Sequence, residues 1–241
     1  MPTKPASGTL VNTSHALATN LFVAYLCNEG SGTTLVDSSQ AAVQKNAVVS
    51  LTAISWGLSK FDGISSALVS VATAGATAVD TPDSLNLTGN MSVVAYIFNT
   101  GSDAYGTMFQ VSASKGWWLH VSGAGFKSDL YTAADHESAT VLSLNTFYTL
   151  GITLSGTLAT FYTNGVADGT ATVVPGFLFS LMVNDSLSET FIGTFDTFYA
   201  WNNRILTATE MLDLHNDPFA MYGTGQGALL SSKRNRIVLA A

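Results

Sequence analysis

The chain has 241 residues and a mass of 25.2 kDa, a length at which all-β sandwiches commonly fold as one domain. Hydrophobic residues make up 47% of it and charged residues only 10%, while Ser and Thr together number 55, so hydroxyls take many of the solvated positions that Lys and Glu usually hold. This composition excludes an intrinsically disordered chain, and the lack of a long apolar run excludes a membrane span. A net charge of −7 with only 9 Lys and Arg excludes a broad basic surface for nucleic acid.

Residues 1–20 are expected to form an N-terminal arm. They are polar, they are interrupted by Pro2, Pro5 and Gly8, and they follow neither the two-residue nor the 3.6-residue period. The segment lacks the charged start and apolar core of a secretory signal. We therefore expect the protein to act where it is made, or to leave the cell by lysis or as part of a larger particle.

Between residue 21 and about residue 201, short apolar runs are separated by Gly, Asn, Asp and Ser, which is typical of a β-sandwich. The clearest strand candidates lie at residues 21–26, 68–72, 91–98, 108–111, 117–121, 147–154, 158–162 and 191–201. Residues 147–154 alternate between an apolar and a polar face, so we expect one face to be buried. Residues 91–98 are apolar on both faces, which favours a central strand.

Two dipeptides between these runs predict hairpin turns. Ser155-Gly156 separates two strand candidates. Asn164-Gly165 is the dipeptide best suited to the positive φ angles of a type I′ turn.

One short helix is predicted at residues 207–216. Thr207 and Glu210 have the spacing of a capping box, in which each side chain bonds the backbone of the other residue. Met211 and Leu214 lie three residues apart on one face, and Pro218 forces the helix to end near residue 216.

Residues 217–241 are rich in glycine and are interpreted as a C-terminal arm, which completes a division into an N-terminal arm (1–20), a sandwich domain (21–216) and a C-terminal arm (217–241). Ordering each residue of such a tail costs about 1–2 kcal/mol of backbone entropy, more than its apolar side chains return when they are buried. We therefore expect both arms to contact other chains. The residues expected to bind a partner are Phe219, Met221, Tyr222, Lys233, Arg234 and Arg236.

The sequence shows no pattern of catalytic residues. The glutamates lie in four separate segments, at Glu29, Glu137, Glu189 and Glu210. No strand therefore carries the paired carboxylates that a glycosidase needs, and we predict that the protein is not an enzyme.

Metal and cofactor sites are not indicated either. The histidines are His15, His120, His136 and His215, and they lack the spacing of zinc ligands. His120 is expected to be a hydrogen-bonded strand residue and Cys27 a buried thiol. Asp37, Asp62 and Asp196 are expected to hold turns by accepting backbone N–H bonds. We predict no bound metal and no cofactor.

Aromatic side chains are the only candidates for a sugar-binding surface. Trp117 and Trp118 are adjacent, so a strand would point them to opposite faces, and Tyr199 and Trp201 share one face of a later strand. A sugar ring stacks well on an exposed aromatic face. The alternative for all four is packing in the core or at a subunit interface.

Five segments resemble the concanavalin A-like lectin/glucanase superfamily, in particular its laminin-G-like and pentraxin-like jelly rolls. They are LFVAYLCNEGSGTTLVDSS, KFDGISSALVSV, SLNLTGNMSVVAYIF, LSLNTFYTLGITLSGTLATFYTNGV and FIGTFDTFYAWNNRILTATEMLDLHN. The resemblance implies an all-β fold, a two-sheet antiparallel jelly-roll sandwich with one short C-terminal helix and extended N- and C-terminal arms. The family often has further carboxylates after Phe-Asp-Gly, where this chain has Ile64-Ser65-Ser66. The family also often has a Glu after the Asp of the last strand, where this chain has Thr197. The missing carboxylates indicate that this chain has no calcium site.

The two ends, MPTKPASGTLVNTSHAL and DPFAMYG, resemble those of jelly-roll proteins encoded by tailed bacteriophages. Together with the low charge and the arms, this resemblance predicts a virion structural protein, a capsid decoration or tail component made in the host cytoplasm. Its partners would be copies of itself, other virion proteins and host glycans, with no membrane and no specific nucleic acid. The alternative is a free carbohydrate-binding, lectin-like module.

Overall fold

The computed structural model describes residues 3–50, 54–70, 79–80, 86–87, 89–102, 105–112, 115–122, 125–132, 134–173, 177–178, 180–181 and 191–223. Its strands are β1 (Leu21–Tyr25), β2 (Thr34–Leu35), β3 (Ala47–Val49), β4 (Ile54–Leu58), β5 (Ser66–Ser70), β6 (Val79–Asp80), β7 (Asn86–Leu87), β8 (Met91–Ser102), β9 (Tyr105–Ser112), β10 (Lys115–Ser122), β11 (Gly125–Thr132), β12 (Thr146–Ser155), β13 (Leu158–Thr163), β14 (Val166–Thr172), β15 (Phe177–Leu178), β16 (Ser180–Leu181) and β17 (Phe191–Asn202). Its helices are η1 (Ala16–Ala18), α1 (Ala208–Asn216) and η2 (Ala220–Tyr222). In the part of the chain that these ranges cover, no helix has the length and apolar character needed to cross a membrane.

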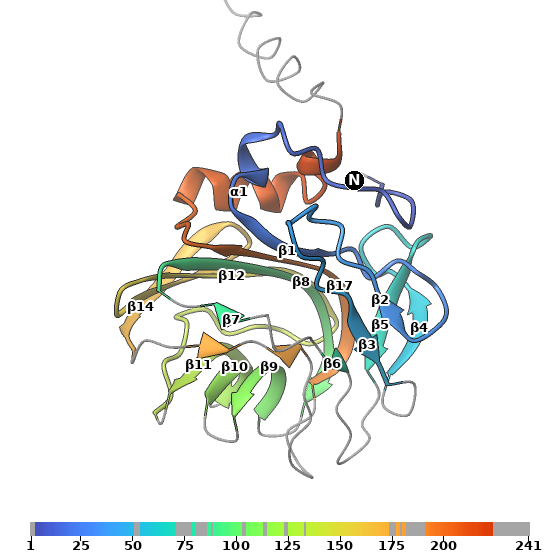
Figure 1. Ribbon diagram of the computed structural model, residues 1–241. Helices are drawn as coiled ribbons and strands as arrows, with labels where there is room; N and C mark the ends of the chain where they lie inside the picture. The colour runs from blue at the N-terminus through green and yellow to red at the C-terminus, as the bar shows by residue number, and fades with distance from the viewer. Residues whose placement is uncertain are drawn as a thin grey trace, which may run out of the picture.

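Two sheets pack face to face, and the larger one curves over the smaller (Figure 1). The larger sheet has the strand order β14-β13-β12-β8-β17-β5-β4, with β1 also paired to β17, and the smaller has the order β11-β10-β9-β16. All the strand pairs that the structure describes are antiparallel. The predicted all-β, two-sheet antiparallel jelly roll is confirmed.

The central strand β8 has an apolar core on each of its faces, as its sequence predicts. The main core lies between the two sheets and receives every second residue of β8, namely Met91, Val93, Ala95 and Ile97. The residues between them, Val94 and Tyr96, belong to a second core on the outer face of the larger sheet. A strand that is apolar on both sides is covered on both sides because exposure of either face would cost hydrophobic free energy.

Each of the eight predicted strands overlaps a strand of the structure, although residues 71–72 lie outside the described ranges. Among the strands of five or more residues, β4, β11 and β14 were not predicted. In β11, Lys127 and Asp129 interrupt the apolar residues, so the segment lacks the apolar run by which the other strands were predicted.

Both predicted hairpins are present. Asn164 and Gly165 have φ angles of 52° and 78°, which confirms a turn that needs two positive φ values. The other turn lies one residue later than expected: Ser155 pairs with Leu158, so the loop is residues 156–157.

The predicted helix is confirmed as α1, which begins after Thr207. The N–H of Glu210 donates to the Thr207 hydroxyl at 3.2 Å, and the N–H of Thr207 donates to the Glu210 carboxylate at 2.8 Å. Met211 and Leu214 are buried in the second core. Gly151 of β12 allows the close approach of the helix, because a Cβ at that position would lie 3.2 Å from Sδ of Met211.

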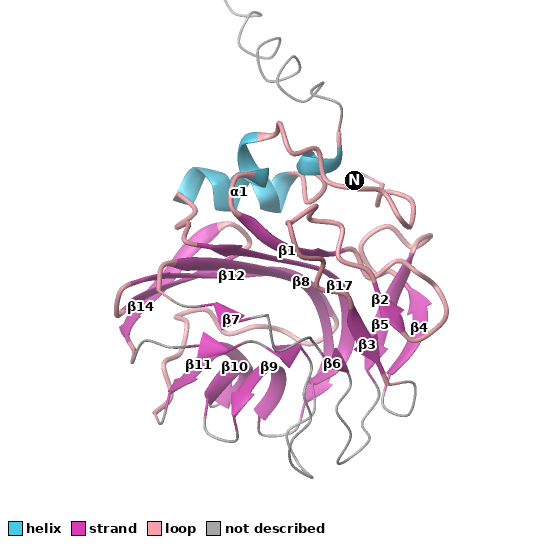
Figure 2. Cartoon of the chain, in the orientation of Figure 1, coloured by secondary structure: helices cyan, strands magenta, loops and turns pink. Residues whose placement is uncertain are grey.

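The described parts of both predicted arms, residues 3–20 and 217–223, pack on the outer face of the chain's own larger sheet (Figure 2). Val11, Leu17 and Met221 are buried there. Partner contacts were expected because burial on a single sheet was taken to be too weak to offset the entropy of ordering these segments. The outward-facing aromatic residues of β8 and β17 supply both apolar surface and hydrogen-bonding groups, so the sheet holds these segments itself.

This packing corrects the assignment of partner-binding residues. Phe219 and Met221 are buried within their own chain. Tyr222 places its hydroxyl 2.7 Å from that of Ser38. Phe219 and Met221 are therefore not available to a partner, whereas Tyr222 is only partly buried against the same core. The other residues of that prediction, Lys233, Arg234 and Arg236, lie outside the described residues.

Candidate functional site

The adjacent tryptophans of β10 face opposite sides of the smaller sheet, but both are buried. Trp117 lies in the main core, where its indole N–H donates to the Ser128 hydroxyl at 2.7 Å. Trp118 is only 3% exposed and stacks on Tyr131, with ring centroids 4.6 Å apart. A sugar requires an accessible ring face, so this burial corrects the expectation of a sugar-stacking role. The alternative that the sequence left open, core packing, describes Trp117, whereas Trp118 is buried against Tyr131 on the other face of the smaller sheet.

The aromatic pair on β17 has a structural role as well. Tyr199 and Trp201 are fully buried. The Tyr199 hydroxyl donates to the carbonyl of Pro218 at 2.9 Å, and the Trp201 indole N–H donates to the carbonyl of Leu17 at 2.7 Å. These two residues fix the C-terminal and N-terminal segments to the sheet, and they are not a sugar-binding surface.

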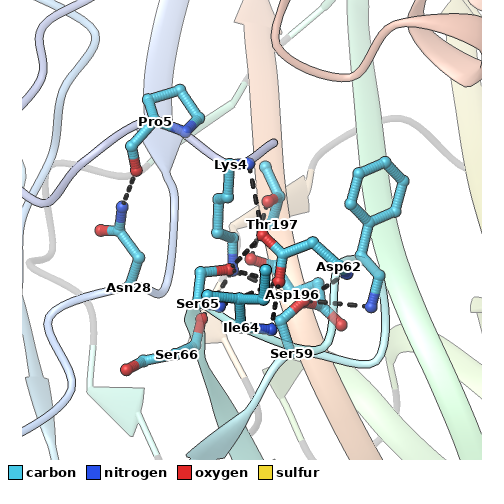
Figure 3. A network of polar contacts seen from close by, with 11 residues as sticks. Lys4, Pro5, Asn28, Ser59, Asp62, Ile64, Ser65, Ser66, Asp196 and Thr197 are labelled. Atoms are coloured by element: carbon cyan, nitrogen blue, oxygen red, sulfur yellow. Dashed lines mark hydrogen bonds and ion pairs between the residues drawn. The ribbon is translucent and has the colours of Figure 1, made fainter. Parts of the chain in front are cut away.

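A buried polar network links the N-terminal segment to the last strand (Figure 3). The ammonium of Lys4 lies 3.5 Å from Oδ1 of Asp196 and donates to the carbonyl of Ser66 at 2.8 Å. The Ser59 hydroxyl also donates to Oδ1 of Asp196, and the backbone N–H of Lys4 donates to Asp62 at 3.3 Å. Burial raises the pKa of Asp196, and the Lys4 ammonium opposes that rise.

This network does not fit the calcium ion that the family resemblance raises. Ca²⁺ takes six to eight oxygen ligands, several of them anionic. Here the positive charge beside Asp196 is the Lys4 ammonium, and the Ser65 hydroxyl donates to Asp62 at 2.7 Å. A lysine side chain therefore already supplies a counter-charge to the buried Asp196 carboxylate.

All three aspartates that were expected to accept backbone N–H bonds do so, and Asp196 accepts one from Lys60. Asp62 accepts the N–H groups of Ile64 and Ser65 at 3.0 and 2.9 Å. Asp37 is fully buried and accepts the N–H groups of Ala24 and Ser39.

Cys27 is buried as predicted. Burial raises the pKa of its thiol above the ordinary value, which makes it a poor nucleophile at neutral pH.

A second polar group lies on the outer face of the smaller sheet, and we call it the His120 cluster. Its members are His120, Lys127, Asp129, Asp135 and Glu137. In the antiparallel pair of β10 and β11, Trp118 lies opposite Asp129 and His120 lies opposite Lys127. Because Trp117, Leu119 and Leu130 face the main core, these alternate residues face outward.

The chain after β11 completes the cluster by folding back along the edge of that strand. Asp129 forms an isolated bridge with Glu137, and the N–H of Ser138 donates to the carbonyl of Ser128 at 2.7 Å. This return places Asp135 and Glu137 beside the side chains of β10 and β11.

The contacts within the cluster are ionic. Nδ1 of His120 lies 2.9 Å from Oε1 of Glu137, and Nζ of Lys127 lies 3.3 Å from its Oε2. These three side chains are partly exposed, at 17%, 24% and 22% for His120, Glu137 and Lys127. Asp135 is exposed. The outer edge of the cluster therefore offers both donors and acceptors to solvent.

Asp129 lies at the bottom of the cluster and is fully buried. Burial raises the pKa of its carboxyl to about 7, although the N–H of His136 donates to Oδ1 at 2.7 Å and acts in the opposite direction. Its other oxygen, Oδ2, is buried without a hydrogen-bond partner. The structure therefore leaves one acceptor at the bottom of this cluster unsatisfied.

This cluster was not predicted from the sequence. His120 was expected to be a hydrogen-bonded strand residue; it lies in β10, and its contact with Glu137 is an ion pair. The sequence did not bring Asp129, Asp135 and Glu137 together, because β11 was not predicted and the chain return after it carries no local signal. The alternation of Lys127, Asp129 and Tyr131 was the signal available.

The three clustered carboxyl groups reopen the question of glycoside hydrolysis. A glycosidase places two carboxyl groups on either side of the bond that it cleaves. Asp129, whose raised pKa would suit a general acid, is fully buried and cannot reach a glycosidic oxygen. The arrangement suits binding through the exposed members of the cluster better than acid catalysis.

Comparison with known proteins identifies the group to which this fold is related. The model of the concanavalin A-like lectin/glucanases superfamily matches residues 73–211, more than half of the chain. A search of curated proteins found no match.

Solved structures share the fold at low identity. Domain 4 of an extracellular arabinanase from Geobacillus stearothermophilus, solved in complex with arabinotriose, superposes with a TM-score of 0.63 at 16% identity, over 81% of this chain and 98% of that one. The binding domain of Paraclostridial mosquitocidal protein 1 gives 0.64 at 14% identity, over 85% of this chain and 53% of that one. Trypanosoma rangeli sialidase gives 0.59 at 14% identity, over 86% and 34%. This chain thus spans about half of the toxin domain and a third of the sialidase.

Proposed function

This chain belongs to the concanavalin A-like lectin/glucanases superfamily, and we propose that it is a non-catalytic carbohydrate-binding module that holds an oligosaccharide at the His120 cluster. The observation that carries the proposal is the placement of partly exposed His120, Lys127 and Glu137 beside exposed Asp135 on one outer face. Sugar hydroxyls both donate and accept hydrogen bonds, and this group offers both kinds of partner.

The position of the cluster supports the same function. It lies on the smaller sheet, whereas α1 and the described terminal segments cover the opposite side of the molecule (Figure 1). The partly exposed ring of Tyr131, which rests on Trp118, lies on the same face as the cluster. An aromatic ring beside charged groups is a combination suited to sugars, because it pairs an apolar surface with hydrogen-bonding groups.

The superfamily and its solved relatives support a glycan as the ligand class. The arabinanase domain was solved with arabinotriose, and a related structure concerns a botulinum neurotoxin whose cell entry depends on two ganglioside molecules. Arabinan fragments and sialylated glycans are therefore the first ligands to try.

The competing interpretation, a virion structural protein, rested chiefly on arms that needed a neighbouring chain. Residues 3–20 and 217–223 are instead packed on their own sheet. No observation of the described residues favours a particle role over glycan binding, and we propose the free binding module.

The test is binding of the full chain to a glycan array, followed by calorimetry with arabinotriose and with a sialylated oligosaccharide. We expect saturable binding to at least one glycan class, and Glu137→Gln to weaken it at least tenfold. Asp213→Asn is the matched control, because Asp213 is an exposed carboxylate on α1, on the other side of the larger sheet. Binding that both variants leave unchanged, or no binding to any glycan, would overturn the proposal.

A further inference from the structure

We propose that His120, Asp129 and Asp135 form a binding site for a divalent transition-metal ion, with Zn²⁺ as its best-suited occupant. One possible ligand atom from each residue lies within 4.8 Å of the other two. Ligand atoms bound to zinc at about 2.0–2.2 Å in a tetrahedral arrangement are about 3.4 Å apart. The three ligand atoms therefore need to move closer together by little more than an ångström to bind zinc. The exposed side chain of Asp135 can make most of this movement.

The buried oxygen of Asp129 is an independent indication of a ligand. Asp129 is fully buried, and its Oδ2 has no hydrogen-bond partner. Its Oδ1 is held by the N–H of His136 at 2.7 Å, which fixes the orientation of the carboxyl group. A buried acceptor without a partner is costly and uncommon in folded proteins, and a metal ion at this position would satisfy it.

The surroundings of His120 also suit a metal ligand. Histidines that bind metals usually have one ring nitrogen on a carboxylate or a carbonyl, which orients the ring. Oε1 of Glu137 lies 2.9 Å from Nδ1 of His120 and makes such a contact. Lys127 lies 3.3 Å from the other oxygen of Glu137, so its positive charge is directed at Glu137, which is not one of the three ligands.

The chemistry of the three ligands selects the class of metal. Imidazole nitrogen suits Zn²⁺ and its neighbours in the first transition row, whereas Ca²⁺ and Mg²⁺ prefer an all-oxygen set. One imidazole and two carboxylates are a mixed set with three protein ligands, which leaves a further position for water or another ligand. The three residues come from β10, β11 and the chain after β11, so a bound ion would cross-link these three segments.

The direct test is titration of metal-stripped full-length protein with ZnCl₂, followed by calorimetry and by thermal unfolding. We expect one Zn²⁺ per chain, an increase in melting temperature, and binding of Ca²⁺ at least a hundredfold weaker. His120→Ala should weaken Zn²⁺ binding at least a hundredfold. Asp135→Asn, at an exposed position that does not endanger folding, should weaken it at least tenfold.

His136→Ala is the matched control, because His136 adjoins the cluster and holds Asp129 only through its backbone N–H. We expect this variant to bind Zn²⁺ as the wild type does. Failure of the wild type to bind Zn²⁺ saturably, or equal binding by wild type, His120→Ala and Asp135→Asn, would overturn the site. The titration contains no sugar, so its outcome is independent of the proposed glycan binding.

Discussion

The ammonium of Lys4 lies 3.5 Å from Oδ1 of Asp196, although 192 positions separate the two residues in the chain, and both side chains are hidden from solvent. The contact joins the N-terminal segment to β17, the strand that also pairs with β1, β5 and β8. A buried carboxylate is costly unless a partner compensates its charge. Lys4 is therefore part of the folding unit, and the N-terminal segment is not an appendage to it.

Replacing Lys4 by methionine should destabilise the protein strongly. The substitution keeps most of the side-chain volume but leaves Asp196 buried without its cation, and the loss of one partner of a buried pair typically costs about 3–5 kcal/mol. Urea unfolding of Lys4→Met and of the wild type measures this difference.

Two further variants separate charge loss from packing loss. Asp196→Asn combined with Lys4→Met should recover part of the stability, because the uncompensated charge is gone. Lys60→Met, at an exposed lysine of the neighbouring loop, should change the free energy of unfolding by less than about 0.5 kcal/mol. Equal stability of Lys4→Met and Lys60→Met would contradict the role given to the ion pair.

The C-terminal segment should contribute to the stability of a single chain. Met221 is fully buried, and the backbone N–H of Asn12 donates to its carbonyl at 2.7 Å. Met221→Ala should cost about 2–5 kcal/mol, because a cavity replaces a core side chain. Light scattering should show the same molar mass for wild type and variant. A change in mass with unchanged stability would instead restore the interpretation of this segment as a partner-binding arm.

Local patterns in the sequence predicted most of the strands, the central position of β8 and the helix cap. These features depend on residues a few positions apart, as in the capping box of Thr207 and Glu210 or the turn at Asn164 and Gly165. Alternation, caps and turn dipeptides are local properties, so a single sequence contains them.

Features that depend on distant contacts were not predictable in the same way. Neither Lys4 nor Asp196 carries a local signal of its partner. Asp196 was expected only to accept backbone N–H bonds, and it does accept one from Lys60. For Tyr199 and Trp201 the sequence allowed two interpretations, a sugar-binding surface or packing within the protein, and only the packing distinguishes them. The His120 cluster depends on a chain return beside β11, and the strand itself was hidden by its charged residues.

The hairpin turn at Gly165 should tolerate a side chain much less well than the turn at Gly156. Both glycines have positive φ, +78° and +60°, so alanine costs about 1–2 kcal/mol of backbone strain at either position. A Cβ at Gly165 would lie 2.8 Å from Cα of Leu212 in α1, whereas a Cβ at Gly156 meets no atom within 4 Å. We expect Gly165→Ala to cost about 1–3 kcal/mol more than Gly156→Ala in urea unfolding. Equal costs would show that α1 is not packed against this turn.

Stability should decrease in acid because of Asp62. Burial acts to raise the pKa of this carboxyl, but hydrogen bonds from Ile64, Ser65 and the backbone of Lys4 outweigh it and lower the pKa to about 2. The unfolded value is about 3.9, so the folded state binds the proton more weakly than the unfolded state. The stabilisation is therefore complete above about pH 4 and is lost as the pH falls towards 2.

Urea unfolding between pH 2 and pH 5 measures this contribution. Asp62→Asn should lower the stability at pH 5 and flatten the decrease below pH 4, because the variant has no carboxyl to protonate at this position. Asp213→Asn, on the exposed side of α1, should keep the pH profile of the wild type. If Asp62→Asn kept that profile as well, the acid sensitivity would have to come from another carboxylate, and the hydrogen bonds at Asp62 would contribute little to folding.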